Sequence, residues 1–130
     1  VPLSIIYFDI DHFKPINDQY GHGAGDKILM ALADGVVQRL RQSDYLLRWG
    51  GEEFLVVLPG TPQANAGQVA EALRQRIAAT DFEHGPGSIT ISAGVGQYQP
   101  REGLRAWVNR VDEALYAAKA GGRNRVQITE

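Results

Sequence analysis

Two adjacent glutamates follow a Gly-Gly pair near the middle of the chain, in the pentapeptide Gly-Gly-Glu-Glu-Phe at residues 50–54. The flanking runs, residues 46–49 and 54–58, are typical of β-strands, so the Gly-Gly pair predicts a hairpin turn between them. Carboxylates near a core cost free energy unless a cation meets them, and a metal ion is the simplest such cation. The pentapeptide is therefore the strongest indication of function in the sequence.

A second pair of carboxylates, Asp9 and Asp11, lies at the end of an apolar run at residues 3–10. If that run pairs with the hairpin, three or four carboxylates converge on one edge of the sheet. Oxygen ligands without cysteine or a histidine cluster favour Mg²⁺ or Mn²⁺. We expect Asp9, Glu52 and Glu53 to bind metal, although the glutamates could be solvated turn residues. We expect Asp11 to cap the helix that follows.

Three basic side chains could bind phosphate: Lys14, Lys119 and Arg123. Lys14 comes just after a predicted strand, where a helix N-terminus can also face an anion. Lys119 and Arg123 lie across the end of the last predicted helix. Cations are favourable at a helix C-terminus in any case, so their spacing alone leaves the two interpretations about even.

Asn17 and Asp26 could bind the edge of a nucleobase, because a carboxylate can accept from both N1–H and N2–H₂ of guanine. The alternative for Asp26 is a first-turn acid that meets the helix dipole. His22 lies between two glycines, a position more typical of a turn residue than of a catalytic one. From the residues alone, these three are weak candidates.

Arg41 and Asp44 form an Arg-x-x-Asp pattern just before the hairpin. Such a pair is common, and a helix-end arginine beside a turn-starting aspartate explains it without any ligand.

The predicted elements that must position these residues follow the order β-α-α-β-β-α-β-α-β. A hairpin and crossovers in this order predict an α+β fold, with a mixed, largely antiparallel five-stranded sheet flanked by helices. The predicted strands are residues 3–10, 44–49, 53–58, 88–98 and 125–129. The predicted helices are residues 13–20, residues 26–40, a helix capped by Thr61 with Pro62 at its first position, and a helix marked by Leu104, Val108, Val111 and Leu115 that Gly121-Gly122 closes. Residues 83–87 are predicted to form a mobile loop.

The bulk properties limit the function classes. A length of 130 residues suits one domain, and a net charge of −2 gives no reason to expect a nucleic-acid partner. The absence of cysteine excludes disulfides and thiolate metal sites and suits a reducing compartment. No apolar run approaches the roughly 20 residues that a membrane span needs. The chain begins inside an apolar run, so we interpret residues 1–130 as a single domain excised from a longer chain.

Taken together, these residues resemble the GGDEF family of diguanylate cyclases, in its GGEEF variant. Four blocks carry the resemblance and span nearly the whole chain in the family's order. They are residues 9–14, residues 17–18 with 21–26, residues 48–54, and residues 116–119 with 122–124. The resemblance implies a fold like that of nucleotidyl cyclases and polymerase palms.

The resemblance also implies a chemistry. Two GTP molecules condense into cyclic di-GMP and two pyrophosphates, each 3′-hydroxyl attacking the α-phosphate of the other nucleotide. Asp9, the carbonyl of Ile10, Glu52 and Glu53 would bind Mg²⁺ or Mn²⁺, with two ions in each active site. Glu52 and Lys14 would be catalytic, and Glu52 would accept the proton.

Further residues receive roles from the same resemblance. Lys14, Lys119 and Arg123 would hold phosphates, and Gly50 and Gly51 would let the backbone approach the nucleotide. Substrate binding would also involve Phe13, Asn17, His22 and Asp26. Relatives that accept ATP carry serine at the position of Asp26, so the carboxylate indicates guanine. The offset of Arg41 and Asp44 from Gly50 matches the family's inhibitory product-binding site.

One domain binds one GTP, so the reaction implies a homodimer. The family's usual Asp-x-Leu-Thr-x-Leu-x-Asn-Arg-Arg block before the first strand is missing, and Pro15 replaces the residue that usually follows the lysine. We therefore expect a monomeric fragment, an upstream sensory or receiver domain in the parent chain, and a cytoplasmic location, with a parent that could be membrane-anchored. The main alternative is a catalytically silent module that senses GTP or cyclic di-GMP. An intramolecular nucleotidyl cyclase is a third possibility.

Overall fold

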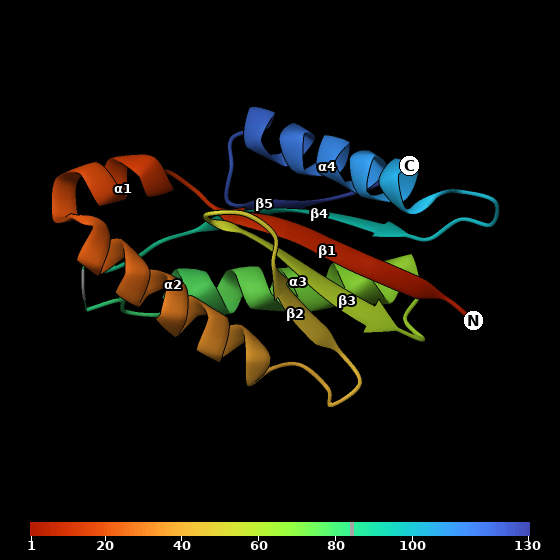
Figure 1. Ribbon diagram of the computed structural model, residues 1–130, viewed down its shortest axis with the longest axis horizontal. Coiled ribbons are helices and arrows are strands. Elements are labelled where there is room, and N and C mark those ends of the chain that lie inside the picture. Colours follow the sequence, from red (N-terminus) through yellow and green to blue (C-terminus); the bar gives the residue numbers. More distant parts are fainter. Residues whose placement is uncertain (84) are drawn as a thin grey trace.

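A five-stranded mixed sheet with four helices forms the protein in the computed structural model, which describes residues 1–83 and 85–130 (Figure 1). The strand order is β2-β3-β1-β4-β5, in which β1 pairs antiparallel with β3 and β4 while β4 and β5 are parallel. The predicted α+β class, element order and largely antiparallel sheet are therefore confirmed. The strands are β1 (Leu3–Ile10), β2 (Tyr45–Arg48), β3 (Glu53–Pro59), β4 (Ile91–Gln97) and β5 (Arg125–Ile128). The helices are α1 (Phe13–Tyr20), α2 (His22–Val37), α3 (Gln63–Ala79) and α4 (Leu104–Ala120).

The central strand β1 is buried on both faces, which explains its nearly continuous apolar sequence. Ile6, Phe8 and Ile10 pack in the larger core with α1, α2 and α3, whereas Ile5 and Tyr7 pack in a smaller core against α4. Figure 1 shows α4 on one side of the sheet and α2 and α3 on the other. By the same alternation, Asp9 belongs to the face that α4 covers.

Helix α4 lies close to the sheet, because β4 carries a glycine, Gly94, at the contact. A Cβ atom on Gly94 would lie 2.4 Å from the carbonyl oxygen of Val111 and 2.6 Å from the amide nitrogen of Leu115. This close approach fixes the position of the helix whose last turn contains Lys119.

Several predicted boundaries are wrong. The second helix begins at His22 and not at residue 26, because Gly21 (φ 90°) alone separates α1 from α2. It ends at Val37 and not at residue 40. The fourth strand begins at Ile91 instead of residue 88. Thr61 does not cap α3: Pro62 holds that position, and the Thr61 hydroxyl donates to the carbonyl of Pro59.

The predicted mobile loop at residues 83–87 includes position 84, which lies outside the described residues. None of the helices in the described part of the chain has the length and apolar character needed to cross a membrane.

Candidate active site at the end of the central strand

Asp9 and Glu53 are directly opposite each other on the neighbouring antiparallel strands β1 and β3. Directly paired residues project from the same face of a sheet, so the two carboxylates share the face covered by α4. Lys119, in the last turn of α4, forms an ion pair with Asp9. The structure therefore brings together two predicted metal ligands and one predicted phosphate ligand.

The Asp9 carboxylate is buried but only partly satisfied. It is 5% exposed, and its Oδ1 atom has no hydrogen-bond partner among the described residues. Burial raises the pKa of Asp9 above its usual value, the charges of Asp11 and Glu52 add to this effect, and Lys119 opposes it. A buried carboxylate oxygen without a partner is suited to bind a cation.

Glu53 is held in place by a residue that the sequence interpretation missed. The hydroxyl of Tyr7 donates a 2.8 Å hydrogen bond to Glu53 Oε2, and burial together with this bond raises the pKa of Tyr7. Tyr7 is two residues before Asp9 on β1, so strand alternation could have indicated that they share a face. On the other side, a Cβ atom on Gly50 would lie 2.5 Å from Glu53 Oε1, so this glycine leaves room for the carboxylate.

The hairpin turn is longer than a two-residue turn, since four residues, Trp49 to Glu52, separate β2 from β3. The amides of Trp49 and Gly50 both donate to the carbonyl of Glu53, at 2.8 and 3.2 Å. Arg48 donates from Nε and Nη2 to the carbonyl of Gly51, at 3.1 and 2.6 Å. Arg48 thus braces the turn that carries Glu52, a role that the sequence pattern did not indicate.

The convergence of three or four carboxylates is not seen in the described part of the chain. Within residues 1–83 and 85–130, no three His, Cys, Asp or Glu side chains form a group that could hold a metal ion. Asp9 and Glu53 meet in register, and Glu52 lies near enough for its charge to act on Asp9. The assignment of these three carboxylates and the Ile10 carbonyl to metal binding stays a prediction.

Asp11 does not cap α1, contrary to expectation. The position before the helix is His12, which has a left-handed conformation (φ 59°) and makes no side-chain capping bond. The Asp11 carboxylate instead accepts hydrogen bonds from Thr90, Ser92 and the backbone of Asn124. These three donors are distant in sequence, so local pattern alone could not reveal them.

The remaining predicted phosphate ligands are exposed. Lys14 is the second residue of α1. Arg123 lies in the short connection between α4 and β5, and its guanidinium makes no ion pair or hydrogen bond with another described residue. Both side chains are therefore available to an anionic ligand.

The side chain of Asn17, a residue of α1, packs against Gly25 of α2. A Cβ atom on Gly25 would lie 1.8 Å from Asn17 Oδ1 and 3.2 Å from Cζ of Phe13, so only glycine leaves space for this amide. Asn17 Oδ1 is buried without a hydrogen-bond partner among the described residues. Phe13 packs in the core, and its contact with a nucleotide stays a prediction.

Asp26 lines a groove of about 510 Å³ between α2 and the hairpin strands. His22 is the exposed first residue of α2. The groove is lined mostly by apolar side chains, as small-molecule sites usually are. Its lining residues are Asp26, Leu29, Met30, Ala33, Leu46, Arg48 and Phe54.

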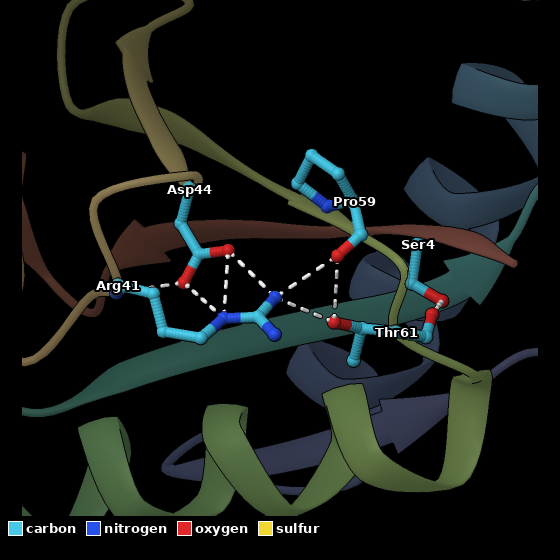
Figure 2. A network of polar contacts seen from close by, with 5 residues as sticks. All are labelled: Ser4, Arg41, Asp44, Pro59 and Thr61. Carbon is cyan, nitrogen blue, oxygen red and sulfur yellow. Dashed lines mark hydrogen bonds and ion pairs between the residues drawn. The ribbon is translucent and has the colours of Figure 1, made fainter.

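Arg41 and Asp44 form the core of a polar network that ties the start of β2 to the end of β3 (Figure 2). Arg41 Nε and Nη2 donate to the Asp44 carboxylate, and Nη2 also donates to the Pro59 carbonyl at 3.0 Å and to the Thr61 hydroxyl at 2.8 Å. Thr61 is tied in turn to β1, because the Ser4 hydroxyl donates to its carbonyl. Figure 2 therefore shows a structural role for the pair that needs no ligand.

The Arg41 side chain nevertheless remains 57% exposed, whereas the Asp44 side chain is 3% exposed. No described residue contacts its Nη1 atom through a hydrogen bond. The network thus presents one edge of the guanidinium to solvent in a fixed orientation.

These features define an α+β domain with an acidic and basic cluster at one end of its sheet and a groove beside it. The family model described as "Diguanylate cyclase, GGDEF domain" matches residues 1–125. The chain therefore belongs to the GGDEF family, as the sequence resemblance indicated.

Individual relatives agree with this assignment. The chain is 47% identical over 128 residues to the diguanylate cyclase DgcP of Pseudomonas aeruginosa, covering 97% of this chain and 19% of DgcP. It is 44% identical over 123 residues to DgcM of Escherichia coli K12, covering 95% and 30%. The chain thus spans less than a third of the length of these curated relatives.

Solved structures show the same fold. The active GGEEF domain of a diguanylate cyclase from Vibrio cholerae matches with a TM-score of 0.92 and 41% identity, covering 99% of this chain and 83% of that one. The GGDEF domain of DgcB from Caulobacter crescentus, solved in complex with c-di-GMP, matches with a TM-score of 0.91 and 32% identity, covering 98% and 77%.

Proposed function

We propose that this domain is a diguanylate cyclase that condenses two GTP molecules into cyclic di-GMP and two pyrophosphates. The observation that carries the proposal is the register pair of Asp9 and Glu53, with Lys119 bound at its side. This cluster lies at the end of the sheet that carries the Gly-Gly-Glu-Glu-Phe segment of this chain. The Asp26 carboxylate, which lines the groove, supports guanine as the base, because it can accept from both N1–H and N2–H₂.

We propose that these acidic residues bind a divalent cation. Asp9 contributes a buried oxygen that lacks a partner, and Tyr7 and Gly50 hold Glu53 at the opposite register position. Asp9, Glu53, Glu52 and the Ile10 carbonyl would bind Mg²⁺ or Mn²⁺, which would neutralise phosphate charge. We propose that Glu52, carried by the braced turn, accepts the proton of the attacking 3′-hydroxyl.

The basic residues divide between two elements. Lys14 approaches the nucleotide from α1, whereas Lys119 and Arg123 approach from the end of α4. We propose that these cations hold the phosphates and stabilise the charge that develops in the transition state. We propose that Asn17 and Asp26 orient the guanine and that His22 also lines the nucleoside site, although of these three residues Asp26 alone lines the groove.

The metal proposal has a test that does not depend on turnover. We expect Mg²⁺ with a non-hydrolysable GTP analogue to raise the Tm of the wild-type domain, since a ligand that binds only the folded state stabilises it. The same mixture should not raise the Tm of Asp9→Asn. Glu113→Gln, on an exposed position of α4, is the matched control and should behave like the wild type. An equal Tm increase in Asp9→Asn would show that Asp9 is not a ligand.

Because one domain offers one such site, the reaction requires two domains that face each other. We propose a homodimer that a regulatory domain of a longer parent chain, sensory or receiver in kind, assembles. The test is to fuse this domain to a leucine zipper, add GTP and Mg²⁺, and identify the product by mass spectrometry. Cyclic di-GMP from the fusion, and none from its Glu52→Ala variant, would support the proposal.

If the fusion binds GTP but forms no product, and its Glu52→Ala variant binds GTP equally well, the result would favour the catalytically silent sensing module. A product cyclised within one nucleotide would identify an intramolecular cyclase.

We further propose that the exposed edge of Arg41 binds the product as an inhibitor. The DgcB domain that matches this chain was solved in complex with c-di-GMP, which makes this nucleotide the ligand to test. We expect Arg41→Ala to abolish product inhibition, whereas Arg39→Ala, an equal loss of charge nearby, should leave it intact. Because Arg41 also anchors the β3 end, calorimetry with c-di-GMP should be paired with a Tm measurement. Unchanged c-di-GMP affinity in Arg41→Ala would overturn this part of the proposal.

A further inference from the structure

Asp11 is a buried carboxylate that the proposed reaction does not use. It is 5% exposed and accepts three hydrogen bonds: from the Ser92 hydroxyl at 2.6 Å, the Thr90 hydroxyl at 2.7 Å and the Asn124 amide at 2.9 Å. Two donors come from the β4 region and the third from the connection between α4 and β5. Asp11 therefore ties the end of β1 to a segment 113 positions later in the chain.

The segment that Asp11 holds has an unusual backbone. Gly122, Arg123 and Asn124 have successive positive φ angles of 121°, 63° and 48°. Non-glycine residues are disfavoured in this region, so two in succession persist only where other contacts stabilise them. Arg123 and Asn124 thus need an external restraint to keep this conformation.

The contacts of the segment supply that restraint. The Arg123 amide donates to the carbonyl of Ala118, in the last turn of α4, at 3.0 Å. The Asn124 amide donates to Asp11 Oδ2, and the Asn124 side chain accepts from Arg74 Nη1 at 2.8 Å. Of these partners, only Asp11 offers a negatively charged acceptor, and hydrogen bonds to charged groups are the stronger ones.

The two aspartates of the Asp-Ile-Asp stretch therefore act on the same region. Asp9 pairs with Lys119 at the end of α4, and Asp11 holds the backbone directly after Arg123. The guanidinium of Arg123 itself is unbonded among the described residues, so the backbone conformation is what sets the direction in which this side chain leaves the main chain.

We propose that Asp11 is a positioning residue that fixes the left-handed turn at Arg123 and thereby aims this guanidinium at the nucleotide phosphates. The proposal rests on the proposed function in assigning phosphate binding to Arg123. It does not require Asp11 to touch the substrate.

The test is a double-mutant cycle on the affinity for a non-hydrolysable GTP analogue with Mg²⁺. Asp11→Asn keeps the size of the side chain but removes the charge, and we expect it to weaken binding by about tenfold, as Arg123→Ala should. The double variant should bind no more weakly than Arg123→Ala, because a misplaced guanidinium and a missing one are equivalent. Additive effects, or unchanged affinity in Asp11→Asn, would overturn the proposal.

Ser92→Ala is the matched control. It removes one hydrogen bond from Asp11 Oδ1 but leaves the bond between Oδ2 and Asn124. We expect it to lower the Tm while it changes analogue affinity less than twofold. A tenfold loss in this variant would show that the effect is one of general stability.

Hydrogen exchange separates a failure of this proposal from a failure of the proposed function. The Asn124 amide should exchange faster in Asp11→Asn than in the wild type, whether or not GTP is the ligand. If wild type does not bind the analogue, the proposed function fails while the exchange result still tests the restraint. If Asp11→Asn does not fold, Arg74→Gln can replace it, because this variant removes the hydrogen bond to the Asn124 side chain. Its loss of analogue affinity should likewise disappear when Arg123→Ala is also present.

Discussion

Two glycines of α2, Gly25 and Gly35, should respond in opposite ways to the same substitution. A Cβ atom on Gly35 would have no atom within 4 Å, whereas one on Gly25 would lie 1.8 Å from Asn17 Oδ1. In both positions alanine improves helix propensity by about 1 kcal/mol. In Gly25→Ala the Asn17 side chain must also move, and overpacking of this kind costs about 1–3 kcal/mol.

The propensity gain cancels when the two variants are compared. Gly35→Ala should therefore be more stable than Gly25→Ala by about 1–3 kcal/mol, or at least about 4 °C in Tm for a domain of this size. Because the displaced group is a candidate guanine ligand, Gly25→Ala should also bind a GTP analogue at least about tenfold more weakly, whereas Gly35→Ala should bind it normally.

Urea denaturation and calorimetric titration of the two purified domains measure both effects. Gly35→Ala controls for helix propensity and for any general effect of an added methyl group. Equal stability of the two variants would refute the packing argument. Normal nucleotide affinity in Gly25→Ala would refute the role of Asn17, even if the stability difference were found.

Three further predictions follow from single contacts. Gly94→Ala should destabilise the domain by about 3 kcal/mol or more in urea denaturation, because its Cβ would meet the backbone of α4; a loss under 1 kcal/mol would contradict the close packing. Tyr7→Phe removes only the hydrogen bond to Glu53. It should lower turnover of the dimerised domain about three- to tenfold, while the free energy of unfolding changes by about 1 kcal/mol or less. Unchanged turnover would exclude a positioning role for Tyr7. Arg74 lowers the pKa of Glu71 to about 2 from a usual value of 4.5, so this carboxylate stabilises the fold fully above about pH 4.5 and loses its contribution as the pH falls toward 2. Glu71→Gln should flatten the pH dependence of stability in that window, by under about 1 kcal/mol because the pair is partly exposed, and an unchanged profile would count against the ion pair.

Local sequence determined the elements with strong periodicity or clear end signals. The bounds of β1 and α1 agree with prediction because a continuous apolar run and a terminal glycine mark them. Ile89, Ile91, Ala93 and Val95 alternate along the chain, and all four pack in the larger core, as a period of two indicates. The start of α2 was missed because glycines near a helix start usually indicate a turn, whereas here Gly25 is needed to admit Asn17.

The sequence also identified the family, since its four motif blocks are patterns of residue type and spacing that need no coordinates. It suggested which residues could form the site, but not how they meet. Asp9 and Glu53 are 44 positions apart, and only the pairing of β1 with β3 makes them direct neighbours.

Tertiary structure alone decided what each polar group contacts. Asp11 was expected to cap a helix, but its donors are Thr90, Ser92 on β4 and the Asn124 amide in a turn near the C-terminus. Arg41 and Asp44 form the predicted pair, but the hydrogen bonds of Arg41 to Pro59 and Thr61 depend on the fold, which brings the start of β2 beside the end of β3. The physical reason is range: helix and strand preferences act over a few residues, whereas buried polar groups take their partners from any segment that packing brings near.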